Sequence, residues 1–189
     1  MKPKGFTLIE LLVVIAILAV LAVAVVLVLN PAELIKQARD STRVSDLAAL
    51  NSAIALYLAD VASPVIGTTA TGFCTSGAST KGTQVCTQSS STVVTNAGWV
   101  PINFGSISSG SPLSRLPMDP NNGSTNCGST LDACFYQYLF ASSTLTFELD
   151  ASMESAKYAN VSTGMERADA DGGNNANAYE VGNDPGLDL

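Results

Sequence analysis

The first part of the chain is an apolar run with one acidic position. From Phe6 to Leu29 the 24 residues are uncharged except for Glu10. Because a helix rises about 1.5 Å per residue, this run would extend about 36 Å, enough to cross a bilayer with some tilt. Residues 6–30 are therefore predicted to form a transmembrane helix, in which a lone carboxylate needs a physical reason.

The hydrophobic pattern changes after Asn30. Apolar residues then recur at steps of three and four while charged residues occupy the other side, as is typical of an amphipathic helix. The recurring apolar positions are Leu34, Ile35, Ala38, Leu47, Leu50, Ile54, Leu58 and Val61. On the polar side, Lys36–Asp40 and Arg43–Asp46 have the spacing of ion pairs.

The two patterns together predict one long helix of about 50 residues, whose amphipathic half covers 31–62. Ser63-Pro64 is expected to end it. Pro31 lacks a backbone N–H, so it predicts a kink or a locally unwound stretch. Such a kink serves either as a simple bend at the membrane surface or as a functional hinge.

The period changes to two in the second half of the chain. Apolar and polar residues alternate over 144–150, and a short turn separates them from the apolar run 134–140, which predicts a β-hairpin with one buried face. Short strands are also expected at 157–158 and 179–181. The predicted fold is α+β, with the long helix packed on a small antiparallel sheet. Residues 63–189 are expected to form this globular domain.

The cysteines indicate the compartment of that domain. The chain has four cysteines and no histidine. The cysteines are Cys74, Cys86, Cys127 and Cys134. Three pairings are open to them, and the two local pairings would close short loops in regions with little else to hold them. A zinc site would need thiolates alone at unusual spacings, so disulfides are expected, in an oxidising space outside the cytoplasm.

The charges limit the partners and the chemistry. The net charge of −7 arises from residues 148–189, where nine acids face two bases, so no nucleic-acid partner is expected. Lys2 and Lys4 precede the apolar run, which places the N-terminus on the cytoplasmic side. Without histidine a Ser-His or Cys-His nucleophile is impossible, and no Gly-rich phosphate loop is present, so we expect no enzyme.

The stretch Lys4-Gly5-Phe6-Thr7-Leu8-Ile9-Glu10-Leu11-Leu12 resembles the cleavage and methylation signature of type IV pilins and type II secretion pseudopilins. The resemblance implies a pilin-like fold and a cytoplasmic leader, residues 1–5, which a prepilin peptidase removes by cutting between Gly5 and Phe6. The same enzyme would methylate the new amino group of Phe6. It also implies single-pass insertion in the inner membrane, an assembly platform there, and identical or related pilin subunits as partners in an extracellular or periplasmic filament.

Such processing would give Glu10 a partner. Cleavage removes Lys2 and Lys4, changes the formal charge from −7 to −9, and leaves an ammonium on Phe6. When helices bundle, the terminus of one subunit can reach the carboxylate of the next, and the pair would set register as much as stability because both charges are costly in a low dielectric. The packing is head to tail and does not close, so it grows.

The acidic tail has the start of a cation loop. Asp169, Asp171 and Asn175 offer oxygens near glycines, and Glu180 falls at position 12 counted from Asp169. The glycine does not fall at position 6, so the EF-hand pattern is incomplete. Major secretion pseudopilins bind calcium in a C-terminal loop, so the resemblance implies Ca²⁺ as a ligand, and the alternative is a plain acidic surface loop.

Three functions stay open at this point. The turn Pro117-Met118-Asp119-Pro120 looks like one found before the sheet of major pseudopilins, which favours a pseudopilus in protein secretion. The four cysteines and the Ser/Thr-rich connector favour a surface type IV pilus or a minor subunit. The third alternative is a single-pass membrane adhesin or receptor that does not polymerise, which would need neither Glu10 nor the Gly5-Phe6 junction.

Overall fold

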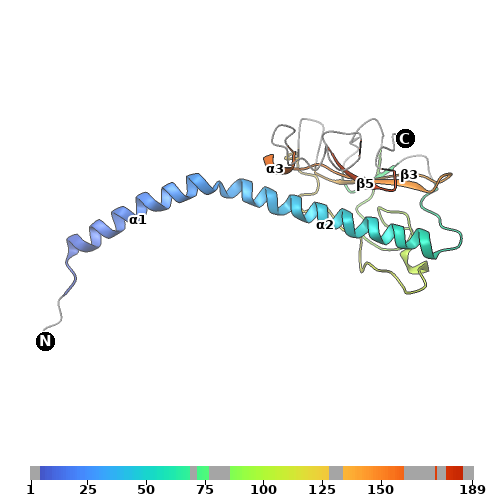
Figure 1. Ribbon diagram of the computed structural model, residues 1–189, viewed down its shortest axis with the longest axis horizontal. Helices are drawn as coiled ribbons and strands as arrows, with labels where there is room; N and C mark the ends of the chain where they lie inside the picture. Colours follow the sequence, from blue (N-terminus) through green and yellow to red (C-terminus); the bar gives the residue numbers. More distant parts are fainter. Residues whose placement is uncertain are drawn as a thin grey trace. The chain divides into compact units, whose positions relative to one another are not determined.

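The computed structural model describes residues 5–68, 72–76, 86–127, 134–159, 173 and 178–184. The chain divides into two compact units, Met1–Ile35 and Lys36–Leu189. The first unit holds the apolar helix and the second holds the rest of the helical region together with the sheet (Figure 1).

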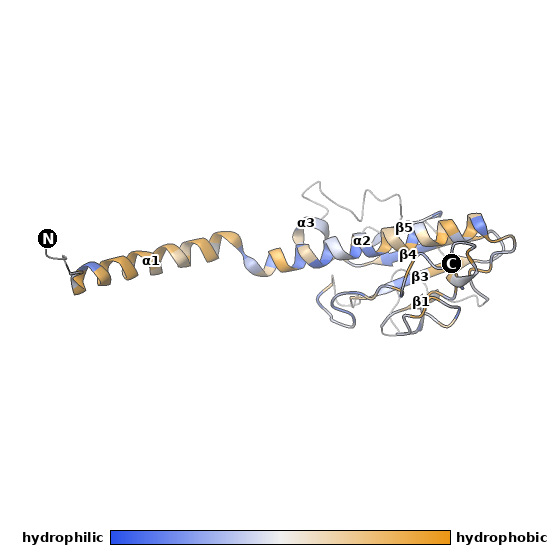
Figure 2. Cartoon of the chain, turned by 90° about the horizontal axis from the view of Figure 1, so that it is seen from below, coloured by the Kyte–Doolittle hydropathy of each residue, from blue (hydrophilic) through white to orange (hydrophobic). Residues whose placement is uncertain are grey.

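The first unit is dominated by α1, Leu8–Leu29. Aliphatic residues surround this helix on all sides, as its orange colour in Figure 2 shows, and none of its described side chains is buried. Leu8–Val26 is long and apolar enough to cross a membrane. A helix that is apolar all round has no polar face for water, so its natural surroundings are lipid or other helices.

The helical region is divided at Asn30. This residue caps α1 in the left-handed conformation, with φ 40° and ψ 72°, and α2, Pro31–Asp60, begins at the next residue. Asparagine tolerates that conformation and proline is favoured at the first position of a helix, so the local sequence explains the break. The continuous helix of the sequence prediction is therefore two helices, divided beside Pro31, where the pattern indicated a kink or an unwound stretch.

In the second unit α2 lies along one face of a five-stranded sheet (Figure 1). The strands are β1 Gly72–Cys74, β2 Cys86–Gln88, β3 Tyr136–Ala141, β4 Thr146–Ala151 and β5 Tyr179–Gly182, in the order β2-β1-β3-β4-β5. The pairs β1–β3, β3–β4 and β4–β5 are antiparallel, but β1 and β2 run parallel. The α+β class is confirmed, and the sheet is mixed instead of wholly antiparallel.

The predicted hairpin is the centre of this sheet. Tyr138 faces Leu149 and Phe140 faces Phe147 across β3 and β4, and these side chains pack with Leu47, Leu50 and Ile54 of α2 in the core. The expected strand at 179–181 is β5. The expected strand at Lys157-Tyr158 is wrong, because these residues lie in the short helix α3, Ala156–Ala159.

Loops complete the core on the side of α2. Trp99 is fully buried and its Nε1 donates to the carbonyl oxygen of Pro117 at 2.9 Å. Phe104 opens a short 3-10 helix, η1 Phe104–Ser106, and contacts Tyr57 edge to face. These contacts hold segment 92–120 against α2.

Two disulfides secure the outer strands and a turn. Cys74 is bonded to Cys86, which ties β1 to β2, and Cys127 is bonded to Cys134. The two local bonds together are one of the three connectivities that four cysteines allow. A three-residue strand pair has few ladder bonds of its own, so the first bridge supplies much of its cohesion.

Candidate functional site

The residues of the predicted processing signal lie together at the start of α1. Gly5 and Phe6 precede the helix in exposed positions, with the Phe6 side chain 78% exposed. Thr7 is the N-cap in an extended conformation, with φ −85° and ψ 150°. Glu10 follows in the first turn, four residues after Phe6.

Glu10 forms a capping box with Thr7. The Oε2 atom of Glu10 accepts from the Thr7 backbone N–H at 2.9 Å and from its hydroxyl at 2.6 Å, and the Thr7 oxygen accepts from the Glu10 backbone N–H at 3.3 Å. Two backbone N–H groups that the start of a helix leaves without partners are thus satisfied, and the Thr7 hydroxyl has an acceptor as well. Sequence reasoning missed this role, although a threonine followed three residues later by a glutamate is its signature.

The capping box does not depend on the leader. Cleavage after Gly5 would turn the Phe6 nitrogen into an amine, but Thr7 would keep its amide N–H and its hydroxyl. Both hydrogen bonds from Thr7 fall on Oε2, and within the described residues no donor reaches Oε1 of Glu10. The carboxylate therefore keeps one oxygen for a further donor while its position is fixed by Thr7.

Comparison with known families identifies this N-terminal segment. Residues 1–26 match the family described as the prokaryotic N-terminal methylation motif, which is the signature of type IV pilins and pseudopilins. The match covers the start of the chain, from the leader through most of α1, and does not extend into the second unit. Neither the curated proteins nor the solved structures gave a match.

A cluster of buried charges holds α2 in the second unit. Arg43 is fully buried, and its guanidinium donates to Asp119 at 2.7 and 2.8 Å, to Asp40 at 2.7 Å and to Glu154 at 2.6 Å. Arg39, partly exposed, forms a second ion pair with Glu154. The cluster joins α2 to the 117–120 turn and to the chain after β4, so three distant segments meet at one side chain.

Further hydrogen bonds tie Asp40 to the chain after β4. Asp40 accepts from the N–H groups of Glu154 and Ser155 at 2.9 and 2.8 Å and from the Ser155 hydroxyl at 2.6 Å. The expected pairs Lys36–Asp40 and Arg43–Asp46 do not form between these described residues. Asp46 instead accepts from the Tyr136 hydroxyl at 2.8 Å. The helix pattern had placed these charges on a solvated side, and tertiary packing buries Asp40 and Arg43.

The pKa values of the cluster follow from these contacts. Burial alone would lower the pKa of Arg43, but its bonds to Asp119, Glu154 and Asp40 outweigh burial and raise it. Burial would likewise raise the pKa of Glu154, and the bonds from Arg39 and Arg43 lower it instead. Arg43 and Glu154 are therefore both charged at neutral pH, and their ion pair fixes α2 to the chain after β4.

Three further acids lie on the sheet face that α2 does not cover. Glu148 and Asp150 of β4 and Glu180 of β5 are buried, and one carboxylate oxygen of each lies within 4.8 Å of the others. Burial, repulsion from Asp150 and hydrogen bonds with Asp150 and Glu180 raise the pKa of Glu148 to about 11. At neutral pH this group therefore holds a proton.

The calcium prediction falls at the edge of this face. Asp169, Asp171 and Asn175 lie outside the described residues, and Glu180 is the one predicted ligand among those that the structure describes. Gly173 lies against the Glu180 side chain, because a Cβ built on it would meet the Oε2 atom at 1.8 Å. Carboxylate oxygens are the donors that Ca²⁺ takes, so the donor chemistry around Glu180 suits the ion, and calcium binding stays a prediction.

Proposed function

We propose that this protein is a structural subunit of a type IV pilus-like or type II secretion pseudopilus filament. The observation that carries the proposal is the methylation motif on residues 1–26 together with α1, whose described apolar side chains are all left uncovered in the single chain. In this proposal a prepilin peptidase cuts between Gly5 and Phe6 and methylates the Phe6 amine. Helices of identical or related subunits then bury the apolar surface in a filament core.

The proposed route begins in the inner membrane. Lys2 and Lys4 keep the leader, residues 1–5, cytoplasmic, residues 6–30 span the bilayer, and the domain from 63 onwards lies outside, where its disulfides are stable. The 31–62 helix connects the two. An assembly platform in that membrane would collect the processed subunits, which leave the bilayer as the filament grows into the periplasm or the extracellular space.

Substitution of Glu10 tests this function. Glu10→Ala should leave insertion and cleavage intact but abolish filaments, because the ammonium of the adjoining subunit would lose its partner in a low dielectric. Removing one partner of a buried pair costs about 3–5 kcal/mol, so the filament yield should fall at least about a hundredfold. Electron microscopy of sheared surface filaments, followed by mass spectrometry of their subunits, measures the yield and tells a pilus from a pseudopilus.

Two further variants distinguish the proposed pairing of Glu10 with a neighbouring ammonium from its role as the cap of α1. Glu10→Gln keeps an acceptor for Thr7 but removes the charge, so it should fail to assemble like Glu10→Ala. Glu33→Ala removes the same side chain beyond Asn30 and should assemble normally. If Glu10→Gln filaments are normal, the carboxylate serves as a cap and the proposed pairing is wrong. If the wild-type chain forms no filament, the non-polymerising membrane adhesin or receptor becomes the better interpretation.

The cleavage site makes a separate prediction. Gly5 has no atom within 4 Å of a Cβ built on it, so a bulky residue fits the chain itself and Gly5→Leu should leave the fold unchanged. A peptidase that grips the chain at this bond would reject the larger side chain. The expected product on a gel is the uncut precursor, and a band of mature size would contradict Gly5 as the residue before the cut.

A further inference from the structure

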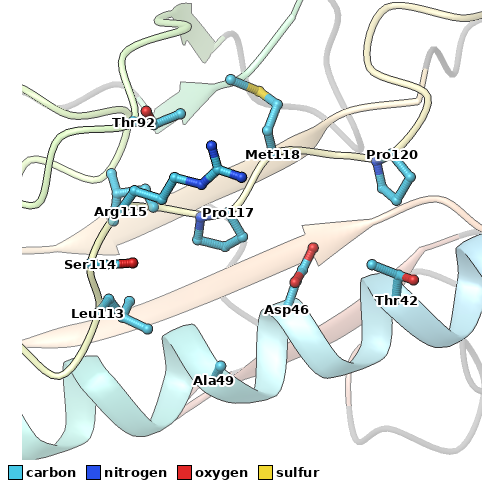
Figure 3. A pocket seen from close by; sticks show the side chains of 11 residues that line it. Thr42, Asp46, Ala49, Thr92, Leu113, Ser114, Arg115, Pro117, Met118 and Pro120 are labelled. Carbon is cyan, nitrogen blue, oxygen red and sulfur yellow. The ribbon is translucent and has the colours of Figure 1, made fainter.

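A groove runs between α2 and the loop that follows η1 in the second unit. Its volume is about 570 Å³, and Thr42, Asp46 and Ala49 of α2 form one wall. The opposite wall is segment 113–120 (Figure 3). We call this cavity the α2 groove. It opens to solvent beside half-buried apolar side chains, Leu113, Pro117 and Met118 among them.

The loop wall of the α2 groove is held on both sides. The Leu116 backbone N–H donates to the Thr92 carbonyl at 2.7 Å, and the Pro117 carbonyl accepts from Trp99. Asp119 is bonded to the buried Arg43. A wall fixed by these contacts and by two prolines loses little conformational entropy when it binds, so the groove is preformed.

The α2 groove carries two opposite charges that do not meet. Arg115 is exposed and extends along the loop over Pro117, while Asp46 points into the groove from α2 (Figure 3). Both residues line one cavity, yet no ion pair joins them, and within the described residues no acid pairs with Arg115. Asp46 is held by Tyr136 instead. Arg39 and Arg43, by contrast, are bound in the buried cluster.

We propose that the α2 groove receives an acidic segment of a second copy of this chain, whose carboxylate pairs with Arg115. The proposal rests on the proposed filament function and adds a contact outside the apolar helix. After processing the chain carries a formal charge of −9 with only seven basic residues, so neighbouring copies repel one another unless acids meet the few free cations. One arginine facing Asp46 is no basic patch, which argues against nucleic acid as the occupant.

The charge of Arg115 provides the first test. Arg115→Glu, an exposed change, should lower the yield of sheared filaments at least about tenfold, because like charges would meet in the groove. Arg115→Lys should keep most of the yield. Lys157→Glu makes the same charge change at an exposed site outside the groove, so it should assemble as the wild type does. Cleavage and the melting temperature of the full chain in detergent should be unchanged in all three variants.

A photo-crosslinker at Leu113 provides the second test, and it does not require a charge change. Filaments grown from a mixture of light and heavy isotope chains should give crosslinks that join the two kinds, with an acid-containing peptide as the partner. Crosslinks within one chain, or to another protein or a small molecule, would overturn the proposal. So would wild-type yield from Arg115→Glu. If wild-type filaments form but the mixed crosslinks or the lower yield of Arg115→Glu are not observed, the groove proposal alone is wrong. An absence of wild-type filaments refutes the filament function itself.

Discussion

At the scale of single residues, the Thr7–Glu10 capping box explains how a carboxylate is tolerated at the start of an apolar helix. Two donors from Thr7 partly compensate the charge, and the helix N-terminus adds a favourable dipole. The carboxylate is therefore stabilised before a neighbouring subunit is present. Its second oxygen is the atom that an ammonium from an adjoining copy would meet, so capping and the proposed pairing are compatible.

Arg43 pairs with three buried acids in the second unit. Arg43→Met keeps an unbranched stem but removes the guanidinium, which leaves the carboxylates of Asp40, Asp119 and Glu154 buried without their shared cation. Breaking such a buried cluster costs about 3–5 kcal/mol, so the urea midpoint of the full chain in detergent should fall sharply.

Arg39→Met is the matched control for this prediction. Arg39 is partly exposed and contacts only Glu154 in the cluster, so its loss should cost about 1 kcal/mol or less. Equal midpoints for the two variants would contradict the central role of Arg43.

At the scale of elements, the sequence was informative where periodicity is strong. The apolar run of α1, the alternation in β4 and the amphipathic stripe of α2 all lie where the patterns indicated. The strands β1 and β2 have three residues each in a Ser/Thr-rich connector, too short for a period to show, and pairing with β3 together with a disulfide defines them. The parallel β1–β2 pair could not be read from composition.

The candidate sites were predictable to different degrees. The Gly5-Phe6 junction and Glu10 are recognisable because local sequence carries the signal. The charge cluster was missed because Arg43, Asp119 and Glu154 are far apart in sequence, and only the fold brings their side chains together. Helical spacing suggested Asp46 as the partner of Arg43, but tertiary contacts with buried acids decided the pairing.

The buried carboxyl of Glu148, on the polar face of the sheet, predicts how the stability of the folded chain depends on pH. The pKa of Glu148 is about 11 in the folded chain, far above its ordinary value of 4.5, so the folded state binds a proton that the unfolded state releases. The stability that this carboxyl contributes is complete below its ordinary pKa and is lost as the pH rises toward 11. Between about pH 5 and 8 the loss is at most about 1.4 kcal/mol per pH unit.

Glu148→Gln isolates that effect. The amide imitates the protonated carboxyl and does not titrate, so the melting temperature of the variant should fall less with rising pH than that of the wild type. Thermal melts of both chains measure the difference. A chelator is present so that no metal ion neutralises the three acids and only protons can. Parallel pH profiles would show that Glu148 is ionised in the folded chain and that its burial is compensated in another way.

At the scale of the whole molecule, the boundary between the two compact units predicts an independently folding fragment. The second unit starts at Lys36, so residues 36–189 keep every helical residue of the charge cluster and of the core. Secreted into an oxidising compartment, this fragment should be a soluble monomer with the bonds Cys74–Cys86 and Cys127–Cys134. Its thermal unfolding should be a single cooperative transition, since one apolar core and one charge cluster hold it together.

A shorter fragment that starts at Leu47 sharpens the test. It keeps the fully buried apolar residues of α2, but it lacks Arg39, Asp40 and Arg43, so Asp119 and Glu154 would be buried without a cation. We expect this fragment to lose the cooperative transition, which calorimetry and mapping of the disulfides would reveal. If both fragments unfold alike, the apolar core alone specifies the domain. If neither folds, α1 contributes to the fold of the second unit and the two units are not independent.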